Sequence, residues 1–282
     1  MKKILITGAN SYIGMSFEQY LRQWSDRYSV TTVDMIDDSW RQKDFHGYDV
    51  VFHVAGIAHV KETKENQHLY YEINRNLAVE VAQKSKAEGI GQFVFMSSMS
   101  VYGLDTGVID KNTVPAPKTN YGKSKYQAEQ QISTLADERF KVAILRPPMI
   151  YGKGCKGNFQ AIISYLDKTF VFPNIDNQRS LLYIENFSSF VKMIIDNESY
   201  GTYFPQNREY LNTTQMAKWM AEVKNKRVCF SKVFGMTVKM LFCFSKYARK
   251  AFGTLIYKDC EDFDFNYCIV DNEESVKRSV IC

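Results

Sequence analysis

Tyr121 and Lys125 are the two residues whose types and spacing most directly suggest chemistry. They lie four positions apart, so on a helix both side chains project from the same face. A nearby cation favours the phenolate of a tyrosine, whose reference pKa is about 10, so the pair can act as a proton donor and acceptor. On a solvated helix the same two residues would have no function. The elements around them decide between these readings.

The first half of the chain alternates short apolar segments with helical ones. Strands are expected at residues 3–7, 29–36, 50–54, 93–97 and 142–145, and helices at residues 13–24, 69–88 and 121–135. The strands are continuously apolar, which is typical of a parallel sheet covered by helices on both faces. We therefore predict an α/β fold, with a Rossmann-type doubly wound parallel sheet in a dinucleotide-binding domain over residues 1–148.

Beyond Arg146 the sequence becomes rich in proline and glycine, and the elements alternate less regularly. We predict a smaller C-terminal α/β substrate lobe over residues 149–282, from which residues 179–196 return to the Rossmann domain. Residues 233–252 are apolar at near-helical spacing, with lysines and an arginine interspersed. Two interpretations remain: a helix packed against its own domain, or a basic amphipathic helix resting on a membrane surface.

Composition argues against several functional classes. The net charge is +5, and 36 Lys and Arg residues are interspersed with 31 acidic ones, which does not favour a nucleic-acid partner. The six cysteines show no metal-ligand spacing, so we expect free thiols and no metal site. No apolar run is long enough to span a bilayer or to act as a signal peptide, so we expect a cytoplasmic protein without a transmembrane segment.

A glycine-containing turn follows the first expected strand, and residues 7–14 read TGANSYIG. Gly8 permits a sharp turn, Gly14 permits close approach of helix to sheet, and the N–H groups at the helix start attract phosphate. The turn therefore predicts a dinucleotide pyrophosphate site. Its predicted cofactor-binding residues are Gly8, Asn10, Ser11, Tyr12, Ile13 and Gly14.

Asp34 is the acidic residue expected near the end of the second strand. There it would bind the adenosine ribose hydroxyls and repel a 2'-phosphate, which favours NAD over NADP. The alternative is a solvated strand end. Because the chain to the next strand at residues 50–54 is short, Asp37 is a further candidate beside the adenine. NADP remains an alternative cofactor.

With the turn and the Tyr–Lys pair, the chain resembles the extended short-chain dehydrogenase/reductase family, specifically its NAD-dependent nucleotide-sugar epimerases and dehydratases. Residues 7–14 are similar to the family's T-G-x-x-G-x-x-G, with Ser11 in place of the middle glycine. Residues 96–103 (MSSMSVYG) are similar to its S-S-x-x-V-Y-G signature. Residues 145–152 (LRPPMIYG) and 179–186 (RSLLYIEN) resemble passages near the nicotinamide and the substrate diphosphate.

This resemblance implies a role for each matching residue. Tyr121 would be the acid–base group, Lys125 would lower its pKa and bind the nicotinamide ribose, and Ser98 would orient the substrate oxygen. Asn158 and Arg179 would hold the sugar nucleotide, with a helix cap as the alternative for Asn158. The remaining predicted cofactor-binding residues are Val54, Ala55, Gly56, Asn74, Lys125 and Pro148.

The resemblance also implies an activity. A UDP-hexose or UDP-N-acetylhexosamine would be epimerised at C4 through a 4-keto intermediate, with NAD as cofactor, in cell-surface polysaccharide synthesis. One alternative is an NAD(P)H-dependent 4-ketoreductase of a UDP-4-keto-6-deoxy sugar; another is a non-catalytic dinucleotide sensor, expected to lack the Tyr–Lys pair. A dehydratase is disfavoured because residues 97–100 carry no carboxylate. Relatives commonly dimerise through two helices, which here would be residues 69–88 and 121–135.

Overall fold

The computed structural model describes residues 1–58, 62–260 and 265–281, and the chain forms two compact units. The first unit comprises Met1–Gly103, Val114–Pro147 and Ser188–Pro205. The second comprises Leu104–Thr113, Pro148–Phe187 and Gln206–Cys282. The chain thus passes repeatedly from one unit to the other. The expected domains at residues 1–148 and 149–282 stay a prediction.

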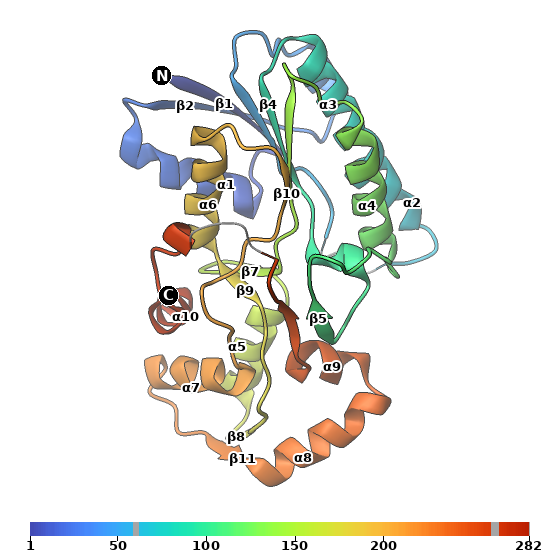
Figure 1. The fold of residues 1–282 in the computed structure, drawn as a ribbon. Helices are drawn as coiled ribbons and strands as arrows, with labels where there is room; N and C mark the ends of the chain where they lie inside the picture. The colour runs from blue at the N-terminus through green and yellow to red at the C-terminus, as the bar shows by residue number, and fades with distance from the viewer. Residues whose placement is uncertain (59–61, 261–264, 282) are drawn as a thin grey trace. The chain divides into compact units, whose positions relative to one another are not determined.

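A six-stranded sheet forms the centre of the first unit, in the order β10-β6-β4-β3-β1-β2, and every neighbouring pair is parallel (Figure 1). The strands are β1 (Lys2–Thr7), β2 (Tyr28–Val33), β3 (Val50–His53), β4 (Gln92–Met96), β6 (Lys141–Leu145) and β10 (Gly201–Tyr203). From β1 the chain builds the sheet first toward β2 and then in the other direction toward β3, β4 and β6. The predicted doubly wound α/β fold is confirmed.

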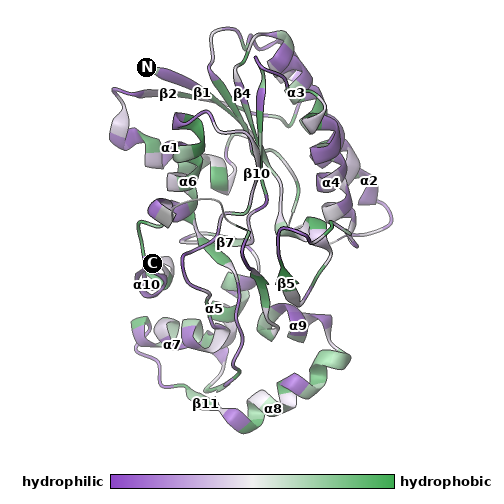
Figure 2. Cartoon of the chain, viewed as in Figure 1, coloured by the Kyte–Doolittle hydropathy of each residue, from purple (hydrophilic) through white to green (hydrophobic). Residues whose placement is uncertain are grey.

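Helices cover both faces of this sheet, with α3 and α4 on one side and α1 and α6 on the other (Figure 1). Their bounds are α1 (Tyr12–Leu21), α2 (Gln67–Tyr71), α3 (Ala78–Ala87), α4 (Asn120–Ser133) and α6 (Ile184–Asp196). Figure 2 shows α6 as mostly hydrophobic and α4 as largely hydrophilic. The buried face of α4 contributes Ala128 and Ile132 to a core that includes Phe93, Phe95 and Ile144 of the sheet.

Two elements of the first unit differ from their predicted form. The single helix expected at residues 69–88 contains a π-helical turn, Glu72–Leu77, between α2 and α3. This turn holds Asn74, whose side chain is buried and bonded to backbone outside the helix. The strand expected at residues 29–36 ends at Val33 because the Asp34 carboxylate accepts a hydrogen bond from the Ile36 N–H, which turns the chain.

Among its described residues, the second unit contains three parallel two-stranded ladders. They pair β5 (Gly107–Ile109) with β12 (Leu255–Tyr257), β7 (Met149–Tyr151) with β9 (Leu181–Tyr183), and β8 (Val171–Pro173) with β11 (Cys229–Ser231). Its helices are α5 (Asn158–Lys168), α7 (Thr213–Val223), α8 (Lys232–Met240), α9 (Lys246–Phe252) and α10 (Asn272–Val280).

The prediction of a single helix over residues 233–252 is wrong. The segment forms α8, a 3₁₀ turn at Leu241–Cys243, and α9. Ser245 separates the 3₁₀ turn from α9, because its hydroxyl caps α9 by accepting a hydrogen bond from the Ala248 N–H at 3.2 Å. None of the described helices is long and apolar enough to cross a membrane.

Candidate active site

The glycine turn lies between β1 and α1, as predicted, and its two glycines occupy crowded positions. Gly8 has φ +101°, a conformation that L side chains rarely adopt. A Cβ there would lie 2.9 Å from the Ala55 backbone nitrogen. A Cβ at Gly14 would lie 2.7 Å from Ser11 Oγ and 3.3 Å from Val54 Cγ2. Only glycine lets the turn approach the loop after β3 this closely.

Ser11, which replaces the usual middle glycine, is the N-cap of α1. Its hydroxyl accepts a hydrogen bond from the Gly14 N–H at 3.1 Å, which satisfies one of the unpaired donors of the first turn. Asn10 precedes it with φ +64°, a left-handed conformation that asparagine tolerates. Tyr12 and Ile13 open the helix and are half-buried. The substitution of Ser11 for glycine therefore gives α1 a fixed starting point.

Asp34 and Asp37 both lie in the exposed segment after β2. Asp34 accepts from the Ile36 N–H at 3.0 Å. Asp37 caps the 3₁₀ turn Asp38–Gln42, and its hydrogen bonds with Ser39 lower the pKa of its carboxyl. Asp34 directly follows β2, which pairs with β1, and there it could bind a ribose hydroxyl. Asp37 instead serves as the N-cap of the 3₁₀ turn. Their cofactor roles stay predictions.

Asn74 holds the loop after β3 in place. The side chain is completely buried, accepts from the Ile57 N–H at 2.8 Å and donates to the Ile57 carbonyl at 3.0 Å. A Cβ at the adjacent Gly56 would lie 2.8 Å from Asn74 Oδ1 and 3.3 Å from Lys125 Nζ. Asn74 thus fixes the Gly56 backbone next to the Lys125 ammonium.

Tyr121 of α4 lies near Ser98, which follows β4, and their catalytic roles stay predictions. Ser98 caps the 3₁₀ turn Met99–Tyr102 by accepting from the Ser100 N–H at 3.1 Å. Burial raises the pKa of Tyr121 above its ordinary value, and the nearby Ser98 acts in the opposite direction. Burial therefore works against the phenolate form of Tyr121, and the nearby Ser98 works in its favour.

A close helix contact places Tyr121 at this position. A Cβ at Gly122 would lie 2.6 Å from the Ser100 carbonyl oxygen, so only glycine allows the start of α4 to touch the turn after β4. Thr119 caps the helix by accepting from the Gly122 N–H at 3.1 Å. The sequence did not point to Gly122.

Lys125 is nearly completely buried, with 4% of its surface exposed. Its ammonium donates to the Met96 carbonyl at 2.8 Å and lies 4.9 Å from the centre of the Phe95 ring. Burial lowers its pKa to about 8, and the Glu129 carboxylate acts in the opposite direction. Lys125 is directed at the end of β4 and is not among the groups that shift the pKa of Tyr121. Its predicted effect on the phenol stays a prediction.

His53 is a neutral residue of the sheet. It is completely buried at the end of β3, and its Nδ1 shares a hydrogen bond with Thr7 Oγ1 at 2.7 Å. Burial, assisted by the charge of Lys125, lowers its pKa to about 3. Within the described residues its Nε2 has no hydrogen-bond partner. These contacts give His53 a structural role within the sheet.

Sequence reasoning missed Glu129, which continues the row of Tyr121 and Lys125 one helical turn further. Glu129 is 2% exposed, and Arg146 Nη2 binds its carboxylate at 2.6 Å while Arg146 Nη1 donates to the Tyr102 hydroxyl at 2.9 Å. Ser97 also donates to the carboxylate. The carboxylate of Glu129 therefore binds Arg146 and Ser97, and its role is structural. The four-residue spacing is the signal that could have revealed it.

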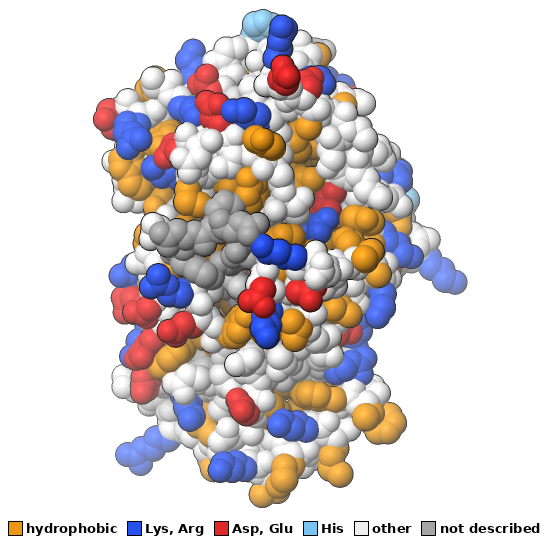
Figure 3. All heavy atoms as spheres, in the orientation of Figure 1, with side chains coloured by type: hydrophobic (Ala, Val, Ile, Leu, Met, Phe, Trp, Pro, Cys, Tyr) orange, Lys and Arg blue, Asp and Glu red, His pale blue; other side chains and the backbone are white. Residues whose placement is uncertain are grey.

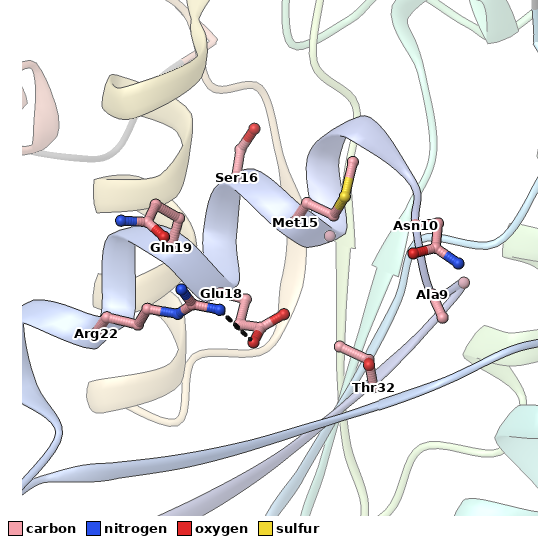
Figure 4. A pocket seen from close by; sticks show the side chains of 10 residues that line it. Ala9, Asn10, Met15, Ser16, Glu18, Gln19, Arg22 and Thr32 are labelled. Carbon is pink, nitrogen blue, oxygen red and sulfur yellow. Dashed lines mark hydrogen bonds and ion pairs between the residues drawn. The ribbon is translucent and has the colours of Figure 1, made fainter.

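A pocket of about 470 Å³ opens beside the turn (Figure 4). Its lining includes Ala9 and Asn10 of the turn and Thr32 of β2. Along α1 it is bordered by Glu18 and Arg22, which form an ion pair at 3.2 Å. The pocket thus occupies the nucleotide end of the predicted site, and neither Tyr121 nor Lys125 lines it.

The other predicted residues belong to the second unit. Pro148 is buried. Asn158 is exposed at the first position of α5, whose N-cap is Gly157. The alternative that Asn158 only caps the helix is therefore wrong. Arg179 is half-buried beside Asp105, burial lowers its pKa to about 10, and its Nη1 donates to the Gly253 carbonyl at 2.9 Å. An arginine has five N–H donors, so this bond leaves capacity for a diphosphate.

A family model described as the NAD dependent epimerase/dehydratase family matches residues 4–204, most of the chain. The chain belongs to the NAD-dependent epimerase/dehydratase family. A UDP-glucose 4-epimerase from Vibrio cholerae is 32% identical over 220 residues, which are 70% of this chain and 67% of that protein. The family resemblance inferred from the motifs is thus confirmed, and the chain is an enzyme of this family.

Two further comparisons are informative. An N-acetyl-α-D-glucosaminyl-diphospho-ditrans,octacis-undecaprenol 4-epimerase from Escherichia coli O157:H7 is 25% identical over 244 residues, 80% of this chain and 73% of that protein. The structure of UDP-glucuronic acid 4-epimerase from Bacillus cereus in complex with NAD has a TM-score of 0.75, with 99% of this chain and 97% of that chain covered. At 16% identity, this second likeness concerns the fold alone.

The epimerase/dehydratase family uses NAD or NADP, and the first unit fits such a dinucleotide. Gly8 and Gly14 leave open the space that a Cβ would fill, and α1 begins directly at the turn. Asp34 is exposed at the end of the neighbouring β2. These features lie at the carboxyl ends of parallel strands, where doubly wound sheets bind their ligands.

Replacing Arg146 by Met should destabilise the protein by about 3–5 kcal/mol, because the Glu129 carboxylate would stay buried without its cation. Urea denaturation measures the loss. The double variant Glu129→Gln/Arg146→Met removes the uncompensated charge and should recover most of it. A loss below about 1 kcal/mol in the single variant would show that the pair is unimportant for stability.

Lys125→Met should change how stability depends on pH. Between pH 8 and the ordinary lysine pKa of about 10.5, the unfolded state binds a proton at Lys125 that the folded state does not, so wild-type stability rises with pH. Relative to Lys125→Met, the wild type should gain about 1.4 kcal/mol per pH unit in this interval. Lys123→Met, at an exposed position of the same helix, is the control. Parallel stability curves for wild type and Lys125→Met would contradict the lowered pKa.

Proposed function

We propose that this protein is an NAD-dependent UDP-hexose or UDP-N-acetylhexosamine 4-epimerase that works through a 4-keto intermediate. The observation that carries the proposal is the proximity of Ser98 to the Tyr121 phenol, with the buried Lys125 one helical turn further along α4. A carbinol oxygen placed between the phenol and the serine would have both a proton acceptor and an orienting partner.

The chain's own residues handle the proton. Tyr121 takes the proton of the C4 hydroxyl and later returns it, while Ser98 fixes the direction of the oxygen. Burial opposes phenolate formation at Tyr121, so a cation has to offset that cost, and Lys125 is the residue one turn away that can do so. When bound, NAD would accept the C4 hydrogen as hydride and return it to the other face of the ketone.

The relatives support a sugar attached to a diphosphate. Both are 4-epimerases, one of UDP-glucose and the other of an N-acetylglucosaminyl-diphospho-undecaprenol. Arg179 and Asn158 are the residues proposed to bind the diphosphate and the sugar nucleotide. We assign NAD rather than NADP because the exposed Asp34 carboxylate would repel a 2'-phosphate. Tighter binding of NADP than of NAD in a titration would contradict this assignment.

Tyr121→Phe should lower turnover by roughly 10²–10⁴-fold without loss of NAD binding, because it removes only the acid–base group. The assay follows interconversion of UDP-glucose or UDP-N-acetylglucosamine with its C4 epimer, without added reductant. Tyr126→Phe removes a hydroxyl from the same helix and should leave turnover unchanged. The undecaprenyl-diphosphate sugar, assayed in parallel, determines whether the carrier is a nucleotide or a lipid.

Three outcomes would contradict the proposal. Oxidation of NADH by a UDP-4-keto-6-deoxy sugar, without epimerisation, would identify a 4-ketoreductase. Tight NAD binding without turnover of any sugar would identify a dinucleotide sensor. Full activity of Tyr121→Phe would exclude the acid–base role of this residue.

A further inference from the structure

The segment formed by α8, the following 3₁₀ turn and α9 carries large apolar side chains on its surface. We call this set the α8–α9 apolar surface. Figure 3 shows such side chains along the lower edge of the view, where α8 lies, with Lys and Arg among them. The exposed fractions are Val233 69%, Met236 60%, Met240 75%, Leu241 48%, Phe244 88% and Tyr247 88%.

Helix α8 is apolar on two opposite faces. Gly235 and Val238 are buried on its inner face, and a Cβ at Gly235 would collide with the Asn174 carbonyl oxygen, so the helix is fitted closely to its own unit. Val233, Met236 and Met240 follow helical spacing on the outer face. The inner face explains how the helix is held. The outer face presents several exposed apolar side chains close together on one helix face, a feature that marks an interaction site.

Basic residues accompany this surface, and acidic residues are missing from the sequence around it. Residues 223–258 contain nine Lys and Arg residues and no Asp or Glu. Lys232, Lys239 and Lys246 are exposed within or beside the helices themselves. Lys226 lies 5.1 Å from the ring centre of the exposed Phe170, and its ammonium donates to backbone carbonyls at the end of α5, so the available cations are those of α8 and α9. The charge pattern therefore complements an extended anionic surface.

We propose that the α8–α9 apolar surface docks the protein on the surface of an anionic phospholipid bilayer. Phe244, Met240 and Val233 would enter the boundary between headgroups and acyl chains, and Tyr247 has the amphipathic ring favoured at that depth. The lysines have long apolar stems that let their ammonium groups reach the headgroups while neighbouring side chains are immersed. Each adds attraction to anionic lipid.

A second copy of the chain fits this surface less well. In a symmetric dimer the same patch meets itself, so the lysines of both copies would be brought together with no acid within residues 223–258 to pair with them. Interfaces between proteins are also depleted in lysine. A bilayer with anionic headgroups supplies the missing counter-charge. The docking does not depend on which sugar the protein converts.

Co-sedimentation of the full chain with vesicles tests the proposal. The protein should pellet with vesicles of equal parts phosphatidylglycerol and phosphatidylcholine, and remain in the supernatant with phosphatidylcholine alone. Phe244→Ser/Tyr247→Ser should lower the partition coefficient at least about tenfold, because two exposed rings are lost. Lys239→Gln/Lys246→Gln should lower it roughly fivefold per lysine. None of these four side chains is buried, so the variants should fold.

The control variants remove the same number of exposed apolar side chains or lysines from the first unit. Val114→Ser/Tyr200→Ser removes two exposed apolar side chains of the first unit, and Lys3→Gln/Lys43→Gln removes two exposed lysines; both should pellet like the wild type. Absence of pelleting with the anionic vesicles would overturn the proposal, as would equal pelleting of wild type and Phe244→Ser/Tyr247→Ser. A dimer in light scattering that this variant loses, without any vesicle binding, would assign the surface to a second copy instead.

Discussion

The candidate site depends on a row of buried and half-buried polar side chains along one face of α4. Tyr121, Lys125 and Glu129 occupy successive turns, and burying such groups is costly unless each has a partner. Ser98, the Met96 carbonyl and Arg146 are those partners, and all three come from the ends of β4 and β6 or the turns that follow them. The same contacts that satisfy the row also fix the orientation of the phenol.

The parallel sheet brings the other parts of the site to the same edge. Since neighbouring strands run in one direction, the turn after β1, Asp34 after β2, the Asn74-bound loop after β3 and Ser98 after β4 all follow carboxyl ends. Glycine makes these approaches possible where backbones nearly touch, at Gly8 against Ala55 and at Gly122 against Ser100. The fold thus positions the chemistry through backbone contacts as much as through side chains.

Local patterns were sufficient to predict the fold class and the turn at Gly8, because each is encoded by periodicity or a compact motif. Ser98 was assigned from the family resemblance, and its role beside Tyr121 stays a prediction. Partners distant in sequence were harder to predict. Arg146 was seen only as a boundary of the sequence texture, yet it neutralises Glu129. Capping was hard to predict as well, since Gly157 and not Asn158 is the N-cap of α5, and Ser11 is the N-cap of α1. The break at Ser245 depends on a single capping hydroxyl, which apolar spacing does not reveal.

The central claim is that one hydrogen leaves C4 of the sugar and returns to the same carbon in one active site. The most direct measurement is mass spectrometry of the epimer formed from UDP-glucose or UDP-N-acetylglucosamine deuterated at C4, in ordinary water with unlabelled NAD. The account predicts that the epimer retains deuterium at C4. An epimer that has lost the label to solvent or to exchangeable NADH would contradict it.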